Sequence, residues 1–471
     1  MYTNKIGECT TIIIGKEQTE DGSLVLARSE DLELKNVVNL ESFEETENGH
    51  SEFVSREGGF HCPLPKKRLG YTAMPGTGQS GEWGAAGWNT AGVGMSSTET
   101  IFASARALEL DPLVPNGLAE NSVFNIILPY IYTAREGVER LASLIEEYGC
   151  TEGFGIGFID NKEVWYLESC AGHRYLACRI PNEVYFVTAN QSRFRYYDPN
   201  DHYNYIASTD LMDFARKNGL WTNGDFDFHE AYQRDEKLDT TYNYPRVFGL
   251  QKMFSPQIQN DITKNTFPIF AQPSEKISLQ MLRKAFRYHY DGTLHDPYLH
   301  QNPKEPCRSV SIYRTTQTHI LVSRPWLPKE IGEVTYMAMG IADLSVFVPL
   351  YQGVKHYPEA YCKGNDKSSN DSAYWKFRHV QALGMVNYNC YAPIIKERYL
   401  KLESEIDEQQ KTFEKEYLHI IKSDSESAQK ALQSFSDQML KRALTVTDEL
   451  TEELFTQLNY DTEKMYFFHG A

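Results

Sequence analysis

The sequence of 471 residues contains no cysteine pair at CxxC spacing and no long hydrophobic run. Its eight cysteines are scattered, which excludes the common zinc and dithiol redox motifs. No segment is apolar and long enough to span a membrane, and the polar residues 1–8 lack the apolar core of a secretory signal. These absences predict a cytoplasmic protein with reduced thiols.

Positive charge is also scarce, because 47 Lys and Arg stand against 64 Asp and Glu and give a net charge of −17. This balance argues against nucleic acid or an anionic membrane as a partner, and we interpret it as a contribution to solubility. The hydrophobic fraction of 41% is sufficient for a packed core at this length. The 30 Tyr and 24 Phe favour a strand-rich core.

Glycine and proline are absent from residues 397–460, which are dense in Glu, Lys, Gln and Leu. This composition predicts a long helical hairpin or helix pair, in a part of the chain that becomes helical from about Asp371. We expect these helices to pack on the chain's own core, and an oligomer contact is the alternative.

Strand patterns dominate the middle of the chain. Residues 153–190 contain four short apolar runs separated by turn residues, which predicts an antiparallel meander. Gly153, Gly155 and Gly157 have a spacing found in dinucleotide-binding loops, but they lie within a predicted strand and no helix follows. We therefore expect no dinucleotide site there. Apolar residues at helical spacing in residues 118–148 predict helices that cover a sheet.

One group of residues has the side chains of a metal site, namely His289, Asp291, His295, Asp296 and His300. Carboxylates and imidazoles do bind divalent cations. However, the spacing matches no established metal motif, and Asp-Gly and Asp-Pro pairs mark turns. We therefore predict a solvated loop and no metal.

The stretch that carries the most chemistry is a predicted hairpin near the start of the chain. A β-branched run follows Cys9, a polar turn contains Asp-Gly, and a second apolar run ends at Arg28 and Asp31. A strand, a turn and a second strand are predicted. Pairing of the two strands would bring Cys9, Arg28 and Asp31 together.

That arrangement would suit a nucleophilic cysteine. A thiolate is the reactive form, and a guanidinium such as that of Arg28 lowers the pKa of a neighbouring thiol. Removal of residues 1–8 would give Cys9 a free α-amino group, whose pKa of about 7.7–8 lets it act as a base near neutral pH. Asp31 could hold that amine in place.

Three motifs in this stretch carry a family resemblance: Cys9-Thr10-Thr11, Asp21-Gly22-Ser23 and Arg28-Ser29-Glu30-Asp31. Together they resemble the opening of the dipeptidase A family of cysteine peptidases, peptidase family C69, within the N-terminal nucleophile hydrolases. The resemblance implies an α+β fold, a four-layer αββα sandwich with a C-terminal helical extension. The resemblance and the helical composition of the C-terminal part together predict a leader at residues 1–8, a hydrolase core at 9–370 and a helical part at 371–471 that packs on the core.

The resemblance also implies roles for residues far from the hairpin. Asn190 matches an asparagine that donates to the oxyanion, and Arg246 follows a proline as a second arginine does in the family. A backbone amide near Glu99 is the expected second oxyanion donor, and the Glu99 carboxylate is a candidate for binding a substrate ammonium. Asn89 is a further candidate substrate-binding residue. The family needs no metal, and we expect no cofactor.

The function that these features predict is hydrolysis of dipeptides by Cys9 after the leader is removed. The expected partners are small peptide substrates, with neither nucleic acid nor membrane, and the chain is expected to form a homo-oligomer. Two alternatives remain open. One is an amidase that acts on other small N-acyl amides, as bile salt hydrolase and penicillin V acylase do. The other is a non-hydrolytic protein that resembles the secernins.

Overall fold

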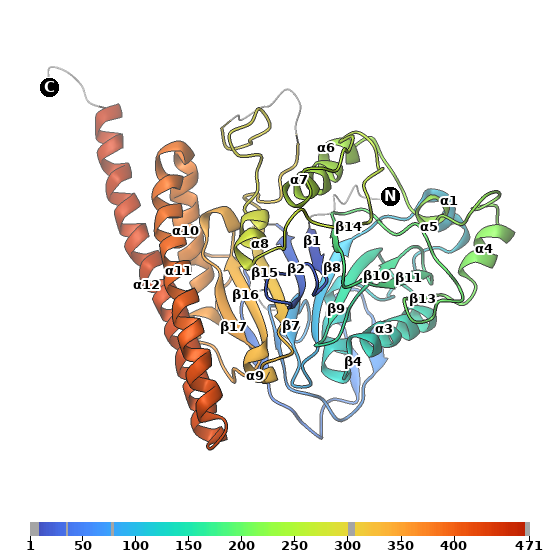
Figure 1. Cartoon of the computed structure of the whole chain (residues 1–471), viewed down its shortest axis with the longest axis horizontal. Coiled ribbons are helices and arrows are strands. Elements are labelled where there is room, and N and C mark those ends of the chain that lie inside the picture. Colours follow the sequence, from blue (N-terminus) through green and yellow to red (C-terminus); the bar gives the residue numbers. More distant parts are fainter. Residues whose placement is uncertain (1–8, 34–35, 77–79, 300–306, 467–471) are drawn as a thin grey trace.

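A computed structural model describes residues 9–33, 36–76, 80–299 and 307–466. Within these residues two antiparallel sheets form the centre of the molecule (Figure 1). The larger sheet has the strand order β14-β12-β1-β2-β15-β16-β17, and the smaller has β13-β11-β10-β9-β8-β7. Two short two-stranded sheets lie in residues 41–73.

The strands of the larger sheet are β1 (Thr10–Ile14), β2 (Leu24–Asp31), β12 (Tyr185–Thr188), β14 (Phe270–Ala271), β15 (Thr315–Ser323), β16 (Glu333–Met339) and β17 (Val348–Tyr351). Those of the smaller sheet are β7 (Ala86–Trp88), β8 (Gly94–Thr100), β9 (Phe154–Ile159), β10 (Val164–Ser169), β11 (Tyr175–Arg179) and β13 (Tyr205–Ala207). The short pairs are β3 (Glu41–Phe43) with β6 (Tyr71–Ala73), and β4 (Glu52–Val54) with β5 (His61–Pro63).

The longer helices are α2 (Glu120–Ile127), α3 (Ala134–Tyr148), α7 (Tyr244–Phe254), α8 (Leu279–Phe286), α10 (Ala373–Val386), α11 (Tyr388–Ile420) and α12 (Ser425–Met465). The shorter ones are α1 (Ala105–Leu110), α4 (Leu211–Lys217), α5 (Phe228–Tyr232), α6 (Asp239–Tyr242) and α9 (Lys329–Gly332). None of the described helices is long and apolar enough to cross a membrane.

The two sheets stack face to face because alternate strand residues bury apolar side chains between them. Leu26 of β2 and Leu321 of β15 share this inter-sheet core with Ile159 of β9. The sheets approach closely at Gly157, where an added Cβ would lie 2.5 Å from a Leu26 methyl carbon. The predicted glycine-rich strand is therefore confirmed, and Gly157 permits close sheet packing.

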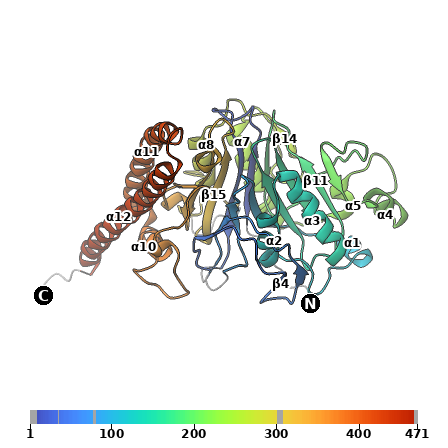
Figure 2. The same cartoon turned by 90° about the horizontal axis from the view of Figure 1, so that it is seen from below.

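Helices cover the outer face of each sheet (Figure 2). The other faces of β1 and β2 share a core with α7, α8 and the three C-terminal helices. The outer face of the smaller sheet packs on α2 and α3. The C-terminal helices thus share a hydrophobic core with the larger sheet, and the division of the chain at residue 370 stays a prediction.

One predicted connection is wrong. Strands β9, β10 and β11 form the expected antiparallel meander, but β12 leaves it and pairs with β1 in the larger sheet, with Thr188 opposite Thr11. Both faces of β12 are buried, because Phe186 enters the inter-sheet core while Val187 faces the helices. Such a strand fits the centre of a sheet, and its alternation does not encode which strand it pairs with.

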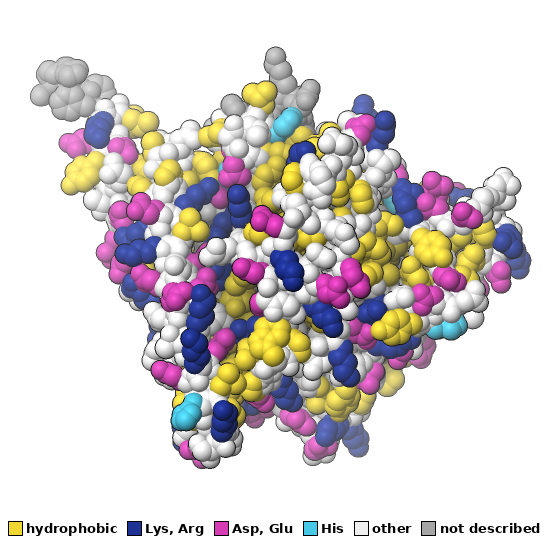
Figure 3. Space-filling model, in the orientation of Figure 1, with side chains coloured by type: hydrophobic (Ala, Val, Ile, Leu, Met, Phe, Trp, Pro, Cys, Tyr) yellow, Lys and Arg dark blue, Asp and Glu magenta, His cyan; other side chains and the backbone are white. Residues whose placement is uncertain are grey.

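The surface carries both signs of charge in close mixture on the face drawn in Figure 3. Lysine and arginine side chains lie beside aspartate and glutamate there, without one large patch of either sign.

Candidate active site

The predicted hairpin is present and brings Cys9 and Arg28 together. Strands β1 and β2 pair with Thr11 opposite Arg28, so the side chains of Cys9 and Arg28 lie on the inter-sheet side. Nη1 of Arg28 donates a hydrogen bond to Sγ of Cys9 at 3.0 Å. Both side chains are almost completely buried.

The guanidinium of Arg28 is itself fixed by two further groups. Its Nη2 donates to the Glu30 carboxylate at 3.1 Å and to the backbone carbonyl of Ser97 in β8. The pairing of β8 with β9 shifts register between Ser97 and Glu99, which marks a β-bulge beside the site. A bulge leaves one residue outside the regular ladder and commonly re-aims backbone groups next to active sites.

Burial and charge act against each other on the Cys9 thiol. Burial raises the pKa of this thiol well above its usual value, and the Arg28 guanidinium opposes that effect. The carboxylates of Glu120, Asp31 and Glu30 raise the thiol pKa further. In the chain that still carries residues 1–8, Arg28 therefore acts in the predicted direction, but burial outweighs it.

Asn190 and Arg246 both meet the backbone of Cys9. The Cys9 N–H donates to Oδ1 of Asn190 at 3.1 Å, and Arg246 donates to the same oxygen at 2.9 Å. Arg246 also donates to the Cys9 carbonyl and, at 3.0 Å, to the Thr10 hydroxyl. The amide nitrogen of Asn190 is 3.3 Å from the Thr100 carbonyl. These two residues converge on Cys9 although more than 180 positions separate them from it.

Asn243 is a site residue that the sequence reasoning did not single out. Its side-chain nitrogen donates to the backbone carbonyl of Asn190 at 3.1 Å, and its oxygen accepts from Arg246 at 2.6 Å. Its nitrogen also donates to Asp239 at 2.6 Å. The only signal in the sequence is its position, one turn before Arg246 at the start of α7.

Asp31 has different neighbours from those expected. It lies on the opposite side of β2 from Arg28 and Glu30, because successive strand residues alternate. Its carboxylate forms an ion pair with Arg308 and accepts a hydrogen bond from Thr315 at 2.5 Å. Arg308 is a second residue without a predicted role, and its side chain is buried together with those of Asp31 and Thr315.

The two substrate-binding candidates have different outcomes. The backbone of Glu99 lies in β8, but its side chain is outside the described part of the structure. Asn89 lies in the turn between β7 and β8, where it donates to the carbonyls of Leu128 and Ile131 and accepts from Ala91 and Val93. These four hydrogen bonds use both N–H donors and both lone pairs of the Asn89 side-chain amide, so none is left for a substrate. The side chain of Asn89 therefore stabilises the turn.

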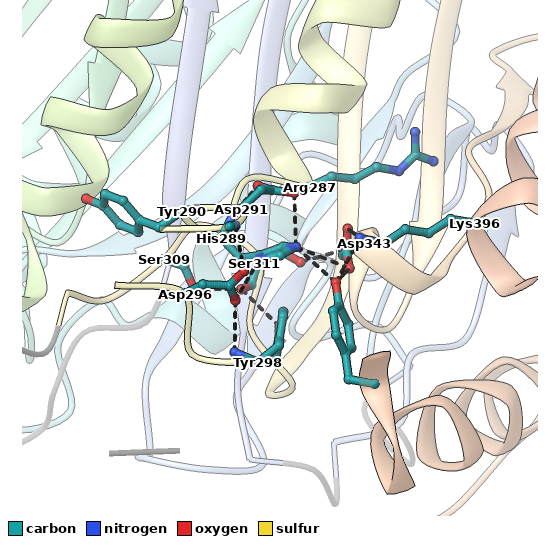
Figure 4. Close-up of polar contacts among 12 residues, drawn as sticks. Arg287, His289, Tyr290, Asp291, Asp296, Tyr298, Ser309, Ser311, Asp343 and Lys396 are labelled. Carbon is teal, nitrogen blue, oxygen red and sulfur yellow. Dashed lines mark hydrogen bonds and ion pairs between the residues drawn. The ribbon is translucent and has the colours of Figure 1, made fainter. Parts of the chain in front are cut away.

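The residues considered for a metal form a different structure (Figure 4). The His289 ring lies 3.1 Å from the Asp296 carboxylate, 3.2 Å from Asp291 and 3.6 Å from Asp343. Lys396 of α11 pairs with Asp343 at 2.8 Å, so the group ties this loop to the C-terminal helices. Burial lowers the pKa of His289, but Asp343 and its neighbours raise it by a larger amount.

The prediction of a solvated loop is therefore wrong for His289 and Asp296, which are buried. It holds for Asp291, which is exposed. His300 lies outside the described residues. Turn residues marked the loop correctly, but they gave no indication that it folds back against α11, where Tyr388 lies 3.0 Å from the His289 ring.

A buried cysteine beside a guanidinium, with an asparagine and a second arginine at its backbone, is a geometry suited to acyl transfer through a nucleophilic thiol. The model of peptidase family C69 matches residues 8–401. The chain belongs to peptidase family C69.

Curated relatives are similar in sequence over most of the chain. A probable dipeptidase of Salmonella dublin is 46% identical over 365 residues, which cover 76% of this chain and 84% of the relative. A probable dipeptidase A of Streptococcus pyogenes serotype M3 (strain SSI-1) is 34% identical over 81% of this chain and 84% of its own. Probable dipeptidase B of Lactococcus lactis subsp. lactis (strain IL1403) is 30% identical over 91% and 93%.

Proposed function

We propose that this chain is a cysteine dipeptidase whose nucleophile is Cys9, made N-terminal by removal of residues 1–8. The proposal extends to the fold, in which two stacked sheets between helical layers would be the αββα sandwich of N-terminal nucleophile hydrolases. The names of the relatives support the substrate class. The observation that carries the mechanism is the hydrogen bond from Arg28 to the Cys9 thiol at 3.0 Å.

Cleavage before Cys9 would convert its backbone nitrogen into a free amine. That nitrogen is held by Asn190 at 3.1 Å, and a free α-amine has a pKa close to neutral. The amine would take the thiol proton, while Arg28 stabilises the thiolate against the effect of burial. Asp31, whose carboxylate is anchored by Arg308, would help to fix the charged amine.

The thiolate would then attack the amide carbonyl of the dipeptide and form a C–S bond. The negative charge on the carbonyl oxygen would be stabilised by the Asn190 NH₂ and by a backbone N–H at the bulge near Glu99. The amine would return its proton to the leaving nitrogen as the C–N bond breaks. The C–N bond cleavage would release the C-terminal amino acid, and water would then hydrolyse the thioester and release the N-terminal amino acid. Arg246 would hold the Asn190 oxygen and the Cys9 carbonyl in place throughout.

The test is the intact mass of the untagged protein together with a panel of dipeptides that carry free or acetylated amino groups. We expect a chain that starts at Cys9 and hydrolyses the free dipeptides only. Turnover of acetylated substrates alone would point to an amidase. A chain that keeps residues before Cys9 and turns over none of them would contradict the proposed activity.

A further inference from the structure

Four polar residues form a block beside the nucleophile, on the side of the larger sheet that faces the smaller one. In the pairing of β2 with β15, Gln317 lies opposite Glu30 and His319 lies opposite Arg28. Residues two apart in a strand share a face, so all four side chains point into the gap between the sheets. All four are almost completely buried.

A continuous line of hydrogen bonds runs through this block to the thiol. Glu30 accepts from Arg28 at 3.1 Å and from Nε2 of Gln317 at 3.1 Å. Oε1 of Gln317 lies 3.0 Å from Nδ1 of His319, and Nε2 of His319 lies 2.8 Å from the Ser96 hydroxyl. The line therefore starts on β8 of one sheet and ends at Cys9 of the other.

The chemistry of the groups fixes the direction of each bond. The Glu30 carboxylate, paired with Arg28, can only accept, so Gln317 must present its NH₂ to it. The Gln317 oxygen then faces His319, whose Nδ1 must donate. A neutral imidazole carries only one N–H, so in a neutral ring Nε2 of His319 accepts from the Ser96 hydroxyl. Burial, with Arg28 nearby, lowers the pKa of His319 well below its usual value, which agrees with a neutral ring.

We propose that Gln317 and His319 are positioning residues that hold the Glu30 carboxylate, and through it the Arg28 fork, against the Cys9 thiol. This inference rests on the proposed function of Cys9 as the nucleophile. Neither residue touches the reacting atoms.

The physical reason lies in how Glu30 shares its hydrogen bonds. Gln317 donates to one carboxylate oxygen, where the Thr316 hydroxyl at 3.4 Å is a weak second donor, and Arg28 donates to the other. Without Gln317, a buried carboxylate would depend mainly on the guanidinium for its stabilisation. The guanidinium would then turn toward Glu30 and loosen its bond to the thiol.

The experiment compares Gln317→Met with Thr318→Val. The first variant keeps the side-chain volume and removes both hydrogen bonds. The second is a matched control in the same strand, since Thr318 is equally buried and its hydroxyl has no hydrogen-bond partner within the described structure. The readouts are the rate at which iodoacetamide alkylates Cys9 as a function of pH, followed by peptide mass, and kcat and KM for a dipeptide.

For Gln317→Met we expect the alkylation profile to move to higher pH, with a rate about tenfold lower at neutral pH, as follows from a shift of one pKa unit. The value of kcat should fall by a similar factor, with KM almost unchanged, because substrate contacts are not altered. Thr318→Val should match the wild type in every readout. A folded Gln317→Met protein with the wild-type profile would overturn the inference.

Ser96→Ala is the second variant, and it decides the question if Gln317→Met does not fold. It removes the donor to His319 at the far end of the line and should move the alkylation profile in the same direction by a smaller amount; an unchanged profile would overturn the inference.

Alkylation reports on the thiol whether or not dipeptides are hydrolysed. An inactive wild type would thus contradict the proposed function, whereas an active wild type with unshifted variants would contradict only this inference.

Discussion

Strands β2 and β15 run side by side, and a buried carboxyl group lies near each end of this pair. The two carboxyl groups differ in their hydrogen-bond donors and in the cations beside them. At one end Glu30 lies 3.1 Å from the Arg28 guanidinium and receives a second hydrogen bond from Gln317. At the other end Glu333 of β16 is equally buried, and within the described structure the hydroxyl of Ser323 at 3.1 Å is its hydrogen-bond donor.

The consequence is a difference in charge. Burial raises the pKa of Glu333 to about 8, so this carboxyl group is largely protonated at neutral pH. Glu30 instead forms an ion pair with the Arg28 guanidinium at 3.1 Å, and this pair orients Arg28 toward Cys9. Burial alone therefore does not distinguish the two carboxyl groups: Arg28 is directly paired with Glu30, whereas the charge of Arg324 only partly opposes the effect of burial on Glu333.

The largest effect is expected from Cys9→Ala, which removes the proposed nucleophile. Dipeptide hydrolysis should fall by at least about a thousandfold, because the remaining groups can only bind and polarise the substrate. Steady-state kinetics with a free dipeptide measures this. Cys150→Ala is the control, since Cys150 is also buried and burial, Asp111 and Glu152 all raise its pKa, with no cation among the described residues to oppose them. Equal activity of wild type and Cys9→Ala would refute the mechanism.

The second prediction concerns Asn190→Asp. The change keeps an oxygen that accepts from the Cys9 nitrogen and removes the NH₂ that would donate to the oxyanion. We expect kcat to fall about 10²–10³-fold, the usual effect of losing one oxyanion donor. Gln191→Glu makes the same chemical change one position further along, where the side chain contacts Asn265 instead, and should cost much less. Similar losses in both variants would remove Asn190 from the oxyanion site.

The sequence predicted the parts of this site that depend on local pattern. The hairpin placed Arg28 beside Cys9 because consecutive strands pair and their residues alternate between the two faces of the sheet. Contacts between distant segments could not be predicted, because the hydrophobic pattern does not specify which strands are neighbours in a sheet. The Asp31–Thr315 bond joins residues 284 positions apart. For the same reason β12 was assigned to the wrong sheet.

The resemblance to a family predicted some of the distant residues that contact Cys9, but not all of them. It supplied Asn190 and Arg246, both of which contact Cys9 in the structure. It did not supply Asn243 or Gln317, whose roles depend on side-chain contacts that only the packed structure displays. Asn89, the other substrate-binding candidate, uses its side-chain amide for hydrogen bonds within and beside its own turn.

The third prediction concerns a variant in which Glu30, like Glu333, has no directly paired cation in the described part of the chain. Arg28→Met leaves Glu30 buried without its cation, and breaking a buried ion pair in this way typically costs about 3–5 kcal/mol of stability. The thiol also loses the group that opposes burial, so alkylation of Cys9 at neutral pH should slow by about 10–100-fold. Urea unfolding and alkylation kinetics measure the two effects. Arg28→Lys, which keeps the charge but not the fork, should recover part of both. If Arg28→Met retained both stability and thiol reactivity, the contrast between the two ends would be lost.

The smallest effect on activity and the clearest dependence on pH are expected from Glu333→Gln. In the folded chain Glu333 holds its proton up to about pH 8, whereas in the unfolded chain it loses the proton near pH 4.3. Between these values the folded state binds more protons, so the wild-type stability that this group contributes is full below about pH 4.3 and is lost as the pH rises toward 8, by up to about 1.4 kcal/mol per pH unit. Glutamine does not titrate. The variant should therefore gain stability relative to the wild type between pH 5 and pH 8, by on the order of a few kcal/mol, with unchanged dipeptide kinetics. Urea midpoints at the two pH values measure this, and a stability difference that does not vary with pH would mean that Glu333 is charged in the folded chain and that the two ends do not differ.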